Sequence, residues 1–142
     1  MIYWFTGQPG SGKTTLAQAW AQETNGIFLD GDTVRQYCRP LPDPYSKGSR
    51  SINVDRMQAI AAYARLTGCL CVACVSPFRD QREDFKKFTD VTEIYCHCEE
   101  QRKPPEYMVD YYEPPLDDYI DFDTDKMSVE DCLSTLRSIH SL

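Results

Sequence analysis

The stretch Gly7-Gln8-Pro9-Gly10-Ser11-Gly12-Lys13-Thr14 decides the fold of this 142-residue chain. It satisfies the phosphate-binding pattern G-x-x-x-x-G-K-[ST] at every fixed position. The β-rich run Ile2-Tyr3-Trp4-Phe5 precedes it, and a helical pattern begins at Lys13. This strand–loop–helix context predicts a P-loop, in which backbone N–H groups and a helix N-terminus bind phosphate.

The residue types in the loop predict a nucleoside triphosphate, ATP, bound together with Mg²⁺. The glycines let the backbone approach a phosphate group without a Cβ in the way. Lys13 is expected to reach the β- and γ-phosphates, and the Thr14 hydroxyl is expected to ligate Mg²⁺. The residues predicted here to bind the cofactor are Gly7, Gln8, Pro9, Gly10, Ser11, Gly12, Lys13, Thr14 and Thr15.

Strand-like and helix-like patterns alternate along the rest of the chain. Apolar runs predict strands at residues 2–5, 27–29, 69–75, 93–98 and 119–123. Helices are predicted at residues 13–23, 51–67, 80–88 and after Ser128, which forms a capping box with Asp131. Proline-rich stretches at 36–48 and 104–115 are expected to be irregular. The alternation predicts one α/β domain over residues 1–142.

The periodicity of two helices also predicts which side chains point into the core. On the helix at 51–67 these are Met57, Ile60, Ala61 and Ala64, and on the last helix they are Val129, Leu133, Leu136 and Ile139.

Composition and charge exclude several classes of function. The chain is 42% hydrophobic and 26% charged, which is ordinary for a globular protein. Its net charge is −7, which argues against non-specific binding to duplex nucleic acid. Residues 1–103 carry 13 basic and 12 acidic side chains, whereas residues 104–142 carry 2 and 10. The first part can therefore still present a positive pocket to a small anion.

The sequence also predicts a cytoplasmic protein that does not associate with a membrane. The longest apolar run, residues 69–75, is too short to span a bilayer, and the N-terminus lacks a secretory core. Seven cysteines, several of them within strand-like runs, fit reduced thiols. We expect Cys69, Cys71, Cys74, Cys96 and Cys98 to pack in the core rather than bind zinc, because no finger-like spacing occurs.

A second motif, Leu29-Asp30-Gly31-Asp32-Thr33-Val34-Arg35, lies at the end of the second predicted strand. Parallel-sheet geometry brings this end close to the P-loop. Asp32 is expected to orient an acceptor hydroxyl or to hold Mg²⁺ through water, and Arg35 to pair with an anionic group of the acceptor. Because the sequence contains no Asn-Lys-x-Asp guanine-binding motif and no conspicuous Asp-x-x-Gly switch, small-molecule phosphoryl transfer is favoured.

The motif at 29–35 resembles Leu-Asp-Gly-Asp-Asn-Val-Arg, the signature of the adenylylsulfate kinases. The likeness continues along the chain at Tyr45-Ser46, at Arg50, Asn53 and Arg56, at Val75-Ser76-Pro77-Phe78-Arg79, at Tyr112-Glu113-Pro114-Pro115 and at residues 128–132. The resemblance implies a three-layer P-loop nucleotide-kinase fold. Its five-stranded, mainly parallel sheet would have the order 2-3-1-4-5, with helices on both faces.

The resemblance also implies a reaction and a role for individual residues. The reaction transfers the ATP γ-phosphate to the 3′-hydroxyl of adenosine 5′-phosphosulfate, with Lys13 and Asp32 as catalytic residues. Asp32, Arg35, Arg50 and Asn53 would bind the acceptor, and Tyr45 would stack on its adenine. Ser76, Pro77 and Phe78 would line the acceptor pocket, where a backbone-shaping role for Ser76 is favoured over a phosphorylated intermediate.

The chain departs from the family pattern after the fourth predicted strand. Adenylylsulfate kinases usually continue there with a basic lid that ends in Phe-Thr-Gly. Here Glu100-Gln101-Arg102-Lys103-Pro104-Pro105-Glu106-Tyr107 leads almost at once to Tyr111-Tyr112. Arg102 is expected to replace the missing lid charge and so joins the predicted cofactor-binding residues, while Tyr107 or Tyr111 would replace the missing aromatic ring.

Two other functions stay open at the level of sequence. One is a P-loop kinase that phosphorylates another hydroxyl, on a nucleoside, a nucleotide or a modified nucleic-acid base, because a reduced lid admits a larger acceptor. The other is a non-catalytic nucleotide-binding module. The expected partner is a small-molecule nucleotide acceptor, and the sequence leaves open whether the chain forms a homodimer.

Overall fold

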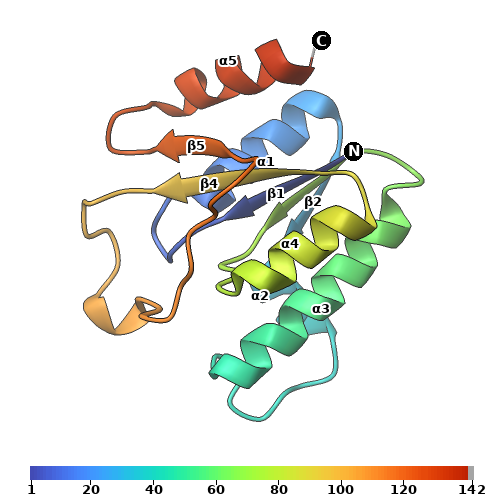
Figure 1. Cartoon of the computed structure of the whole chain (residues 1–142), viewed down its shortest axis with the longest axis vertical. Coiled ribbons are helices and arrows are strands. Elements are labelled where there is room, and N and C mark those ends of the chain that lie inside the picture. The colour runs from blue at the N-terminus through green and yellow to red at the C-terminus, as the bar shows by residue number, and fades with distance from the viewer. Residues whose placement is uncertain (141–142) are drawn as a thin grey trace.

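In the computed structural model, which describes residues 1–140, five strands form one sheet in the order β2-β3-β1-β4-β5 (Figure 1). All four strand pairs are parallel, so the predicted class and strand order are confirmed. The strands are β1 (Ile2–Thr6), β2 (Ile27–Asp30), β3 (Leu70–Ala73), β4 (Val91–His97) and β5 (Ile120–Asp123).

Five helices cover the two faces of the sheet and make it a three-layer structure. They are α1 (Lys13–Thr24), α2 (Gly31–Tyr37), α3 (Lys47–Ala64), α4 (Arg79–Phe88) and α5 (Val129–His140). Helices α1 and α5 pack on one face, while α2, α3 and α4 pack on the other (Figure 1). No helix within residues 1–140 is both long enough and apolar enough to cross a bilayer.

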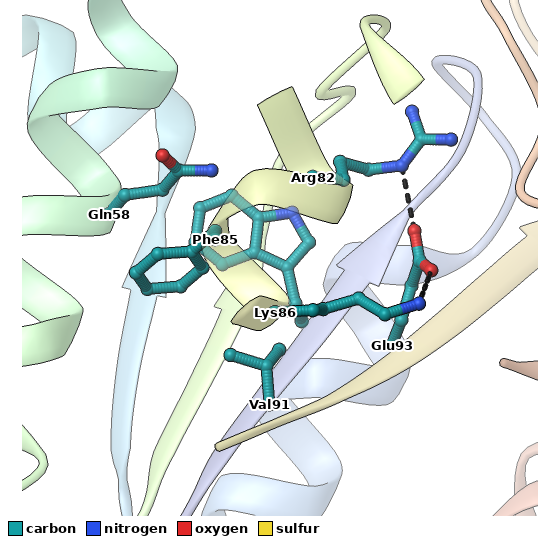
Figure 2. A pocket seen from close by; sticks show the side chains of 7 residues that line it. Gln58, Arg82, Phe85, Lys86, Val91 and Glu93 are labelled. Atoms are coloured by element: carbon teal, nitrogen blue, oxygen red, sulfur yellow. Dashed lines mark hydrogen bonds and ion pairs between the residues drawn. The ribbon is translucent and has the colours of Figure 1, made fainter. Parts of the chain in front are cut away.

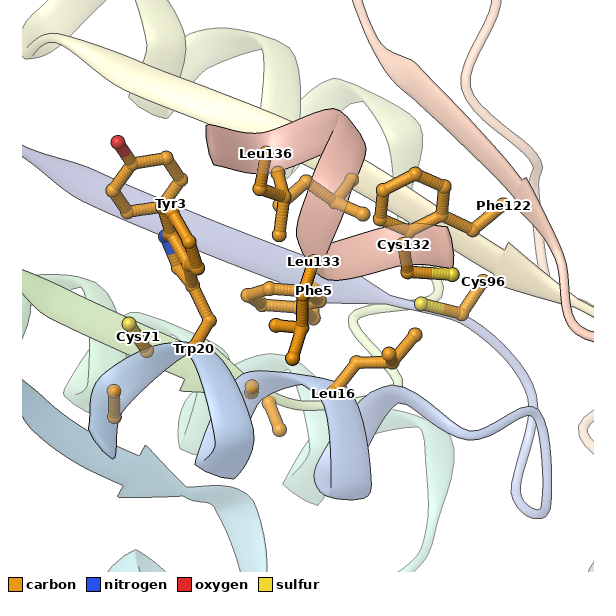
Figure 3. Close-up of a cluster of buried hydrophobic side chains, with 14 residues drawn as sticks. Tyr3, Phe5, Leu16, Trp20, Cys71, Cys96, Phe122, Cys132, Leu133 and Leu136 are labelled. Atoms are coloured by element: carbon orange, nitrogen blue, oxygen red, sulfur yellow. The ribbon is translucent and has the colours of Figure 1, made fainter. Parts of the chain in front are cut away.

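Strand β1 is the centre of the core because it is buried on both faces. Its alternate side chains Tyr3 and Phe5 pack with Leu16 and Trp20 of α1 and with Leu136 of α5 (Figure 3). The side chains that alternate with these, Ile2 and Trp4, pack on the opposite face with α3 and α4. Because both faces of a central parallel strand are buried, its sequence is a continuous apolar run.

The sequence missed helix α2 and misplaced the start of α3. Residues 31–37 are helical, although the pattern gave them no helix, because a segment of seven residues is too short to show a 3.6-residue period. Helix α3 begins at Lys47, four residues before the predicted start, because Ser46 is its N-cap and accepts a hydrogen bond from the Ser49 backbone N–H at 3.3 Å. The irregular stretch is therefore shorter than predicted.

Three side chains predicted to face the core are exposed instead: Ile60, Val129 and Ile139. On α3 the buried stripe contains Val54, Met57 and Ala61, so Ile60 is turned away from the sheet. Helix α5 buries Cys132, Leu133 and Leu136 in the core, whereas Val129 and Ile139 near its two ends are exposed. The predicted capping box is confirmed by reciprocal hydrogen bonds between Ser128 and Asp131, at 2.9 and 3.1 Å.

A buried ion network joins α4 to β4 under the second face of the sheet (Figure 2). Arg82 Nε donates to Glu93 Oε2 at 2.7 Å, and Lys86 Nζ donates to Glu93 Oε1 at 2.9 Å. Burial lowers the pKa of Lys86, but its hydrogen bonds with Glu93 and Glu83 outweigh that effect and raise it. Lys86 also donates to the backbone carbonyls of Asp117 and Asp118, so the network fixes the chain before β5.

The parallel sheet gathers the predicted functional motifs at one edge. The P-loop follows β1, Asp30 ends β2, Ser76 lies just beyond β3, and Thr124 follows β5. The connection from β4 to β5 contains only one 3-10 turn, η1 (Pro105–Tyr107). Binding sites of such sheets lie beyond the carboxyl ends of the strands, and here all these segments meet.

Candidate functional site

The P-loop has the backbone shape of a phosphate cradle. Gly10 and Gly12 adopt positive φ angles of 83° and 95°, which non-glycine residues seldom adopt. A Cβ on Gly7 would lie 2.2 Å from the Cys96 carbonyl oxygen, so no side chain fits there. The Ser11 hydroxyl is buried and has no hydrogen-bond partner within the described chain. A cradle with an orphaned donor fits an anionic ligand such as a triphosphate.

Lys13 lies at the base of the cradle and is almost completely buried. Its Nζ donates to the Gln8 carbonyl oxygen at 3.1 Å. Burial lowers the pKa of Lys13, and nearby negative groups, Asp30 and Asp32 among them, oppose this effect. A desolvated ammonium with no carboxylate in direct contact is well suited to attract phosphate.

Asp30 is a functional candidate to which the sequence analysis gave no role. It ends β2 directly before α2, and burial together with the neighbouring Asp32 raises its pKa. The Lys13 ammonium acts in the opposite direction. The sequence feature that could have identified Asp30 is its place as the first aspartate of the Leu-Asp-Gly-Asp motif.

Asp32 and Arg35 form one charged cluster with Tyr45. Arg35 Nη1 donates to Asp32 Oδ1 at 2.8 Å, and the Tyr45 hydroxyl donates to the same oxygen at 3.2 Å. The Arg35 guanidinium also lies 4.5 Å from the Tyr45 ring centroid, a cation–π contact. Because both hydrogen bonds use Oδ1, the Oδ2 atom of Asp32 is available to accept from an acceptor hydroxyl.

Arg50 and Asn53 both lie on α3, where Arg50 precedes the predicted start of the helix by one residue, and their environments differ. The Arg50 guanidinium lies 5.4 Å from the Tyr45 ring centroid, and its Nε donates to the Tyr45 carbonyl oxygen at 3.1 Å. Asn53 is fully buried, and its Nδ2 donates to the Gly31 carbonyl oxygen at 3.3 Å. Its Oδ1 has no partner within residues 1–140. Through this hydrogen bond Asn53 holds the backbone of the Asp30–Asp32 segment in place.

The Ser76-Pro77-Phe78 segment is held by its backbone and by Trp4. Ser76 has a positive φ of 47°, and its buried Oγ accepts a hydrogen bond from Trp4 Nε1 at 2.8 Å. This contact agrees with a backbone-shaping role for Ser76. Pro77 is buried, whereas Phe78 is partly exposed and stacks on Tyr111 with ring centroids 5.8 Å apart.

Arg102, for which the sequence predicts a role in place of the lid charge, contacts the P-loop. Its Nη1 donates to the Gly10 carbonyl oxygen at 3.3 Å and to Thr124 Oγ1 at 3.0 Å. The guanidinium also pairs with Glu100 and Asp125, so it is not a free cation. Thr124, which the sequence analysis did not include in the site, donates to the Ser11 carbonyl oxygen at 2.8 Å.

The remaining predicted residues fit a nucleotide bound with Mg²⁺. Thr14 and Thr15 are exposed in the first turn of α1, and Pro9 borders a cavity of about 290 Å³ between the P-loop and the connection from β4 to β5. Within residues 1–140, no three His, Cys, Asp or Glu side chains gather into a metal site. An exposed Thr14 hydroxyl at the start of α1 suits an ion held largely by phosphates and water, as Mg²⁺ usually is.

The five cysteines placed in the core by the sequence divide into two groups. Cys71, Cys74 and Cys96 are buried, as predicted, whereas Cys69 is only partly buried. Cys98 is also partly exposed and lies beside the P-loop, with its Sγ 3.7 Å from the Gly10 carbonyl oxygen. All seven thiols are free.

Comparison with known proteins identifies the family. The sequence model of the family described as adenylylsulphate kinase matches residues 1–106. An adenylyl-sulfate kinase of Prochlorococcus marinus is 40% identical over an alignment of 106 residues that covers 68% of this chain and 52% of that protein. This chain thus spans about half the length of that relative. An adenylyl-sulfate kinase of Chloroflexus aurantiacus is 30% identical over 96% of this chain and 86% of its own length.

The fold of this chain also resembles that of a solved structure. The Mycobacterium tuberculosis APS kinase, solved in complex with AMPPNP and APS, superposes with a TM-score of 0.75 at 21% identity. The superposition covers 99% of this chain and 97% of that one. The matched residues 1–106 hold the P-loop, the Asp30–Arg35 motif and the Ser76-Pro77-Phe78 segment. This chain therefore belongs to the adenylylsulphate kinase family.

Proposed function

We propose that this protein transfers the γ-phosphoryl group of Mg·ATP to the 3′-hydroxyl of adenosine 5′-phosphosulfate. The observation that carries the proposal is that the P-loop with Lys13 and the Asp30–Asp32 segment follow parallel strands of one sheet and so lie at the same carboxyl edge. Membership of the family, whose relatives are named adenylyl-sulfate kinases, supplies the acceptor. The APS and AMPPNP of the tuberculosis complex correspond to the two substrates proposed here.

In the proposed reaction the acceptor oxygen forms a bond to the γ-phosphorus, and the bond from that phosphorus to the ADP oxygen breaks. The proton of the acceptor hydroxyl passes to Asp32, whose Oδ2 atom is available to accept it. Lys13 and the backbone N–H groups of residues 7–14 stabilise the charge on the phosphates. When bound, Mg²⁺ neutralises further phosphate charge, and Thr14 and Asp32 are the residues we assign to it.

The remaining residues of the proposed site bind and orient the acceptor. Arg35 and Arg50 would supply positive charge on the two sides of Tyr45, whose exposed ring would contact the acceptor base. Phe78 would line the pocket. Asn53 would act through its hydrogen bond to the Gly31 carbonyl, which supports the turn that carries Asp32.

A coupled assay of ADP release with adenosine 5′-phosphosulfate and Mg·ATP tests the proposal directly. We expect turnover by the wild-type protein and a loss of at least about 100-fold in kcat for Lys13→Ala, the usual effect of removing a group that stabilises transition-state charge. Circular dichroism serves as the control for folding. No turnover from folded wild-type protein would exclude this acceptor.

A kinase that acts on a different hydroxyl is the second candidate, because the shortened connection leaves the 290 Å³ cavity beside the P-loop. A panel of nucleosides, nucleotides and modified bases with labelled ATP separates the two candidates. Label transferred to adenosine 5′-phosphosulfate alone excludes the second. Release of ADP that depends on any acceptor excludes a non-catalytic module. A single kinase domain and a cytoplasmic location remain predictions from the sequence.

A further inference from the structure

The side chain of Gln8 attaches the connection between β4 and β5 to the P-loop at Val109. Gln8 Nε2 donates to the Val109 carbonyl oxygen at 2.7 Å, and Gln8 Oε1 accepts from the Val109 backbone N–H at 2.9 Å. The side-chain amide thus binds both backbone groups of Val109, as a neighbouring strand would. Val109 itself is only 4% exposed. The segment that stands in place of a lid is therefore docked against the loop.

The residues that follow are anchored as well. The Tyr112 hydroxyl lies 2.9 Å from Thr6 Oγ1, and its ring stacks on Tyr95 with centroids 6.0 Å apart. The Glu113 backbone N–H donates to the Pro77 carbonyl oxygen at 2.9 Å. Attachments at Val109 and at residues 112–113 leave the position of Tyr111 well defined.

Tyr111 is held in a cluster with two residues from other parts of the chain. Its ring stacks on Phe78 at an interplanar angle of 13°. The Lys47 ammonium lies 5.4 Å from the Tyr111 ring centroid and 6.0 Å from that of Phe78. Such distances allow both rings to attract the cation through their negative faces.

Two cations of α3 near the proposed acceptor site, Lys47 and Arg50, form no ion pair with a carboxylate among residues 1–140. Arg35 pairs with Asp32, and Arg102 pairs with Glu100 and Asp125. Among residues 1–140, three lysines form ion pairs with carboxylates, Lys86, Lys87 and Lys126, and Lys47 is not one of them. Lys47 also follows Tyr45 by two residues, at the first position of α3, so its charge lies beside the proposed acceptor residues.

We propose that Lys47 binds the anionic group of the acceptor nucleotide and that Tyr111, with Phe78, positions its ammonium for this contact. The inference rests on the proposed function and adds Lys47 to the acceptor site, and it gives Tyr111 a positioning role in place of the lid-ring role that the sequence suggested. Lys47 is the binding residue, and Tyr111 is a positioning residue supplied by the docked connection. Together, Lys47 and Tyr111 would make the site prefer acceptors that carry an anionic group over neutral nucleosides.

Equilibrium binding tests the inference separately from turnover. The protein is saturated with Mg²⁺ and AMPPNP, and adenosine 5′-phosphosulfate, AMP and adenosine are titrated by calorimetry. We expect Lys47→Ala to weaken binding of both anionic ligands about tenfold, as loss of one charge-assisted hydrogen bond does, and to leave adenosine unchanged. Lys47→Arg should retain most of the affinity. Lys87→Ala, an exposed lysine of α4, is the matched control.

Tyr111 variants test the positioning role. Tyr111→Leu should weaken binding of the anionic ligands by about threefold, the size of an exposed cation–π contact, and Tyr111→Phe should restore it. Tyr63→Leu, at an exposed tyrosine near the end of α3, is the control. Equal losses for adenosine and for the anionic ligands, or unchanged binding in Lys47→Ala, would overturn the inference. Absence of turnover in a wild-type protein that binds these ligands counts against the proposed function instead.

Discussion

Within residues 1–140, buried polar groups of the P-loop at the carboxyl edge of the sheet lack partners that a bound anion would supply. Lys13 is buried without a direct carboxylate partner, while Asp30 and Asp32 influence it from the end of the neighbouring β2–α2 segment. The buried Ser11 hydroxyl likewise has no partner within the described residues. In an unliganded protein such groups cost folding free energy, and a bound phosphate satisfies them. At the scale of single residues, the site is built for its ligand rather than for stability.

The pH dependence of stability in the Asp30→Asn variant should show that a charged group in the site costs folding free energy. The folded-state pKa of Asp30 is raised above its ordinary value by burial and by Asp32, so its ionisation destabilises the fold as pH rises through the folded pKa. The asparagine variant lacks that ionisation. Its stability relative to wild type should therefore increase from about pH 3 to about pH 7, as measured by urea unfolding across that range. A constant difference between the two proteins at every pH would contradict the assigned pKa shift.

Arg35→Ala should damage use of the acceptor more than use of ATP. The substitution removes a guanidinium that holds Asp32 Oδ1 and lies over the Tyr45 ring. We expect kcat/KM for the acceptor to fall about 10- to 100-fold, in line with a lost charge-assisted contact, with little change in the KM for ATP. Initial rates with each substrate varied in turn provide the measurement. Unchanged acceptor kinetics would remove Arg35 from the site.

At the scale of elements, one docked connection takes the place of a longer lid. The two hydrogen bonds between Gln8 and Val109 join segments that lie 101 residues apart in the sequence. The same connection presents Tyr111 to Phe78 and Tyr112 to Thr6. Because a docked segment need not order itself when the ligand binds, it provides the acceptor site with a wall that is already formed.

Gln8→Ala should release this connection. With no partner for its backbone N–H, Val109 should exchange its amide hydrogen faster, by about 5- to 30-fold for a loss of about 1–2 kcal/mol of local protection. Hydrogen exchange followed by mass spectrometry of peptides that cover residues 105–113 measures the effect. Gln18→Ala, on the exposed side of α1, is the control. Equal exchange in both variants would show that other contacts hold the segment.

At the scale of the whole molecule, the Arg82–Glu93–Lys86 network joins parts that the chain order separates. It connects α4 to β4 (Figure 2). Through Lys86 it also reaches the backbone carbonyls of Asp117 and Asp118. Arg82 Nη2 also donates to the Glu113 carbonyl oxygen at 2.6 Å. One buried carboxylate therefore links the second face of the sheet to the connection that borders the proposed site.

Glu93→Gln should destabilise the whole fold. It leaves two cations, Arg82 and Lys86, without their buried carboxylate, and breaking a buried pair in this way costs about 3–5 kcal/mol. The free energy of unfolding from urea titration is the measurement. Asp84→Asn, which removes an exposed pair with Lys87, should cost no more than about 1 kcal/mol. Similar losses for the two variants would mean that burial does not strengthen the network.

The sequence alone determined the P-loop, the alternation of strands and helices, and the position of the Asp30–Arg35 motif beside the loop. These features follow from short-range rules: a glycine pattern, an apolar period and the common edge at which parallel strands end. The capping box of the last helix was predicted for the same reason. The strand order followed from the family resemblance, because periodicity carries no information on which strands pair.

Only the tertiary structure decided how the side chains of distant segments meet. It placed Asn53 under Gly31, bound the Ser76 hydroxyl to Trp4, docked Val109 on Gln8 and brought Tyr111 to Lys47 and Phe78. It also turned Ile60 and Ile139 outward, because where a helix meets the sheet is set by packing. Contacts between segments tens of residues apart depend on how all the elements pack together, and a local pattern of residues does not contain that information.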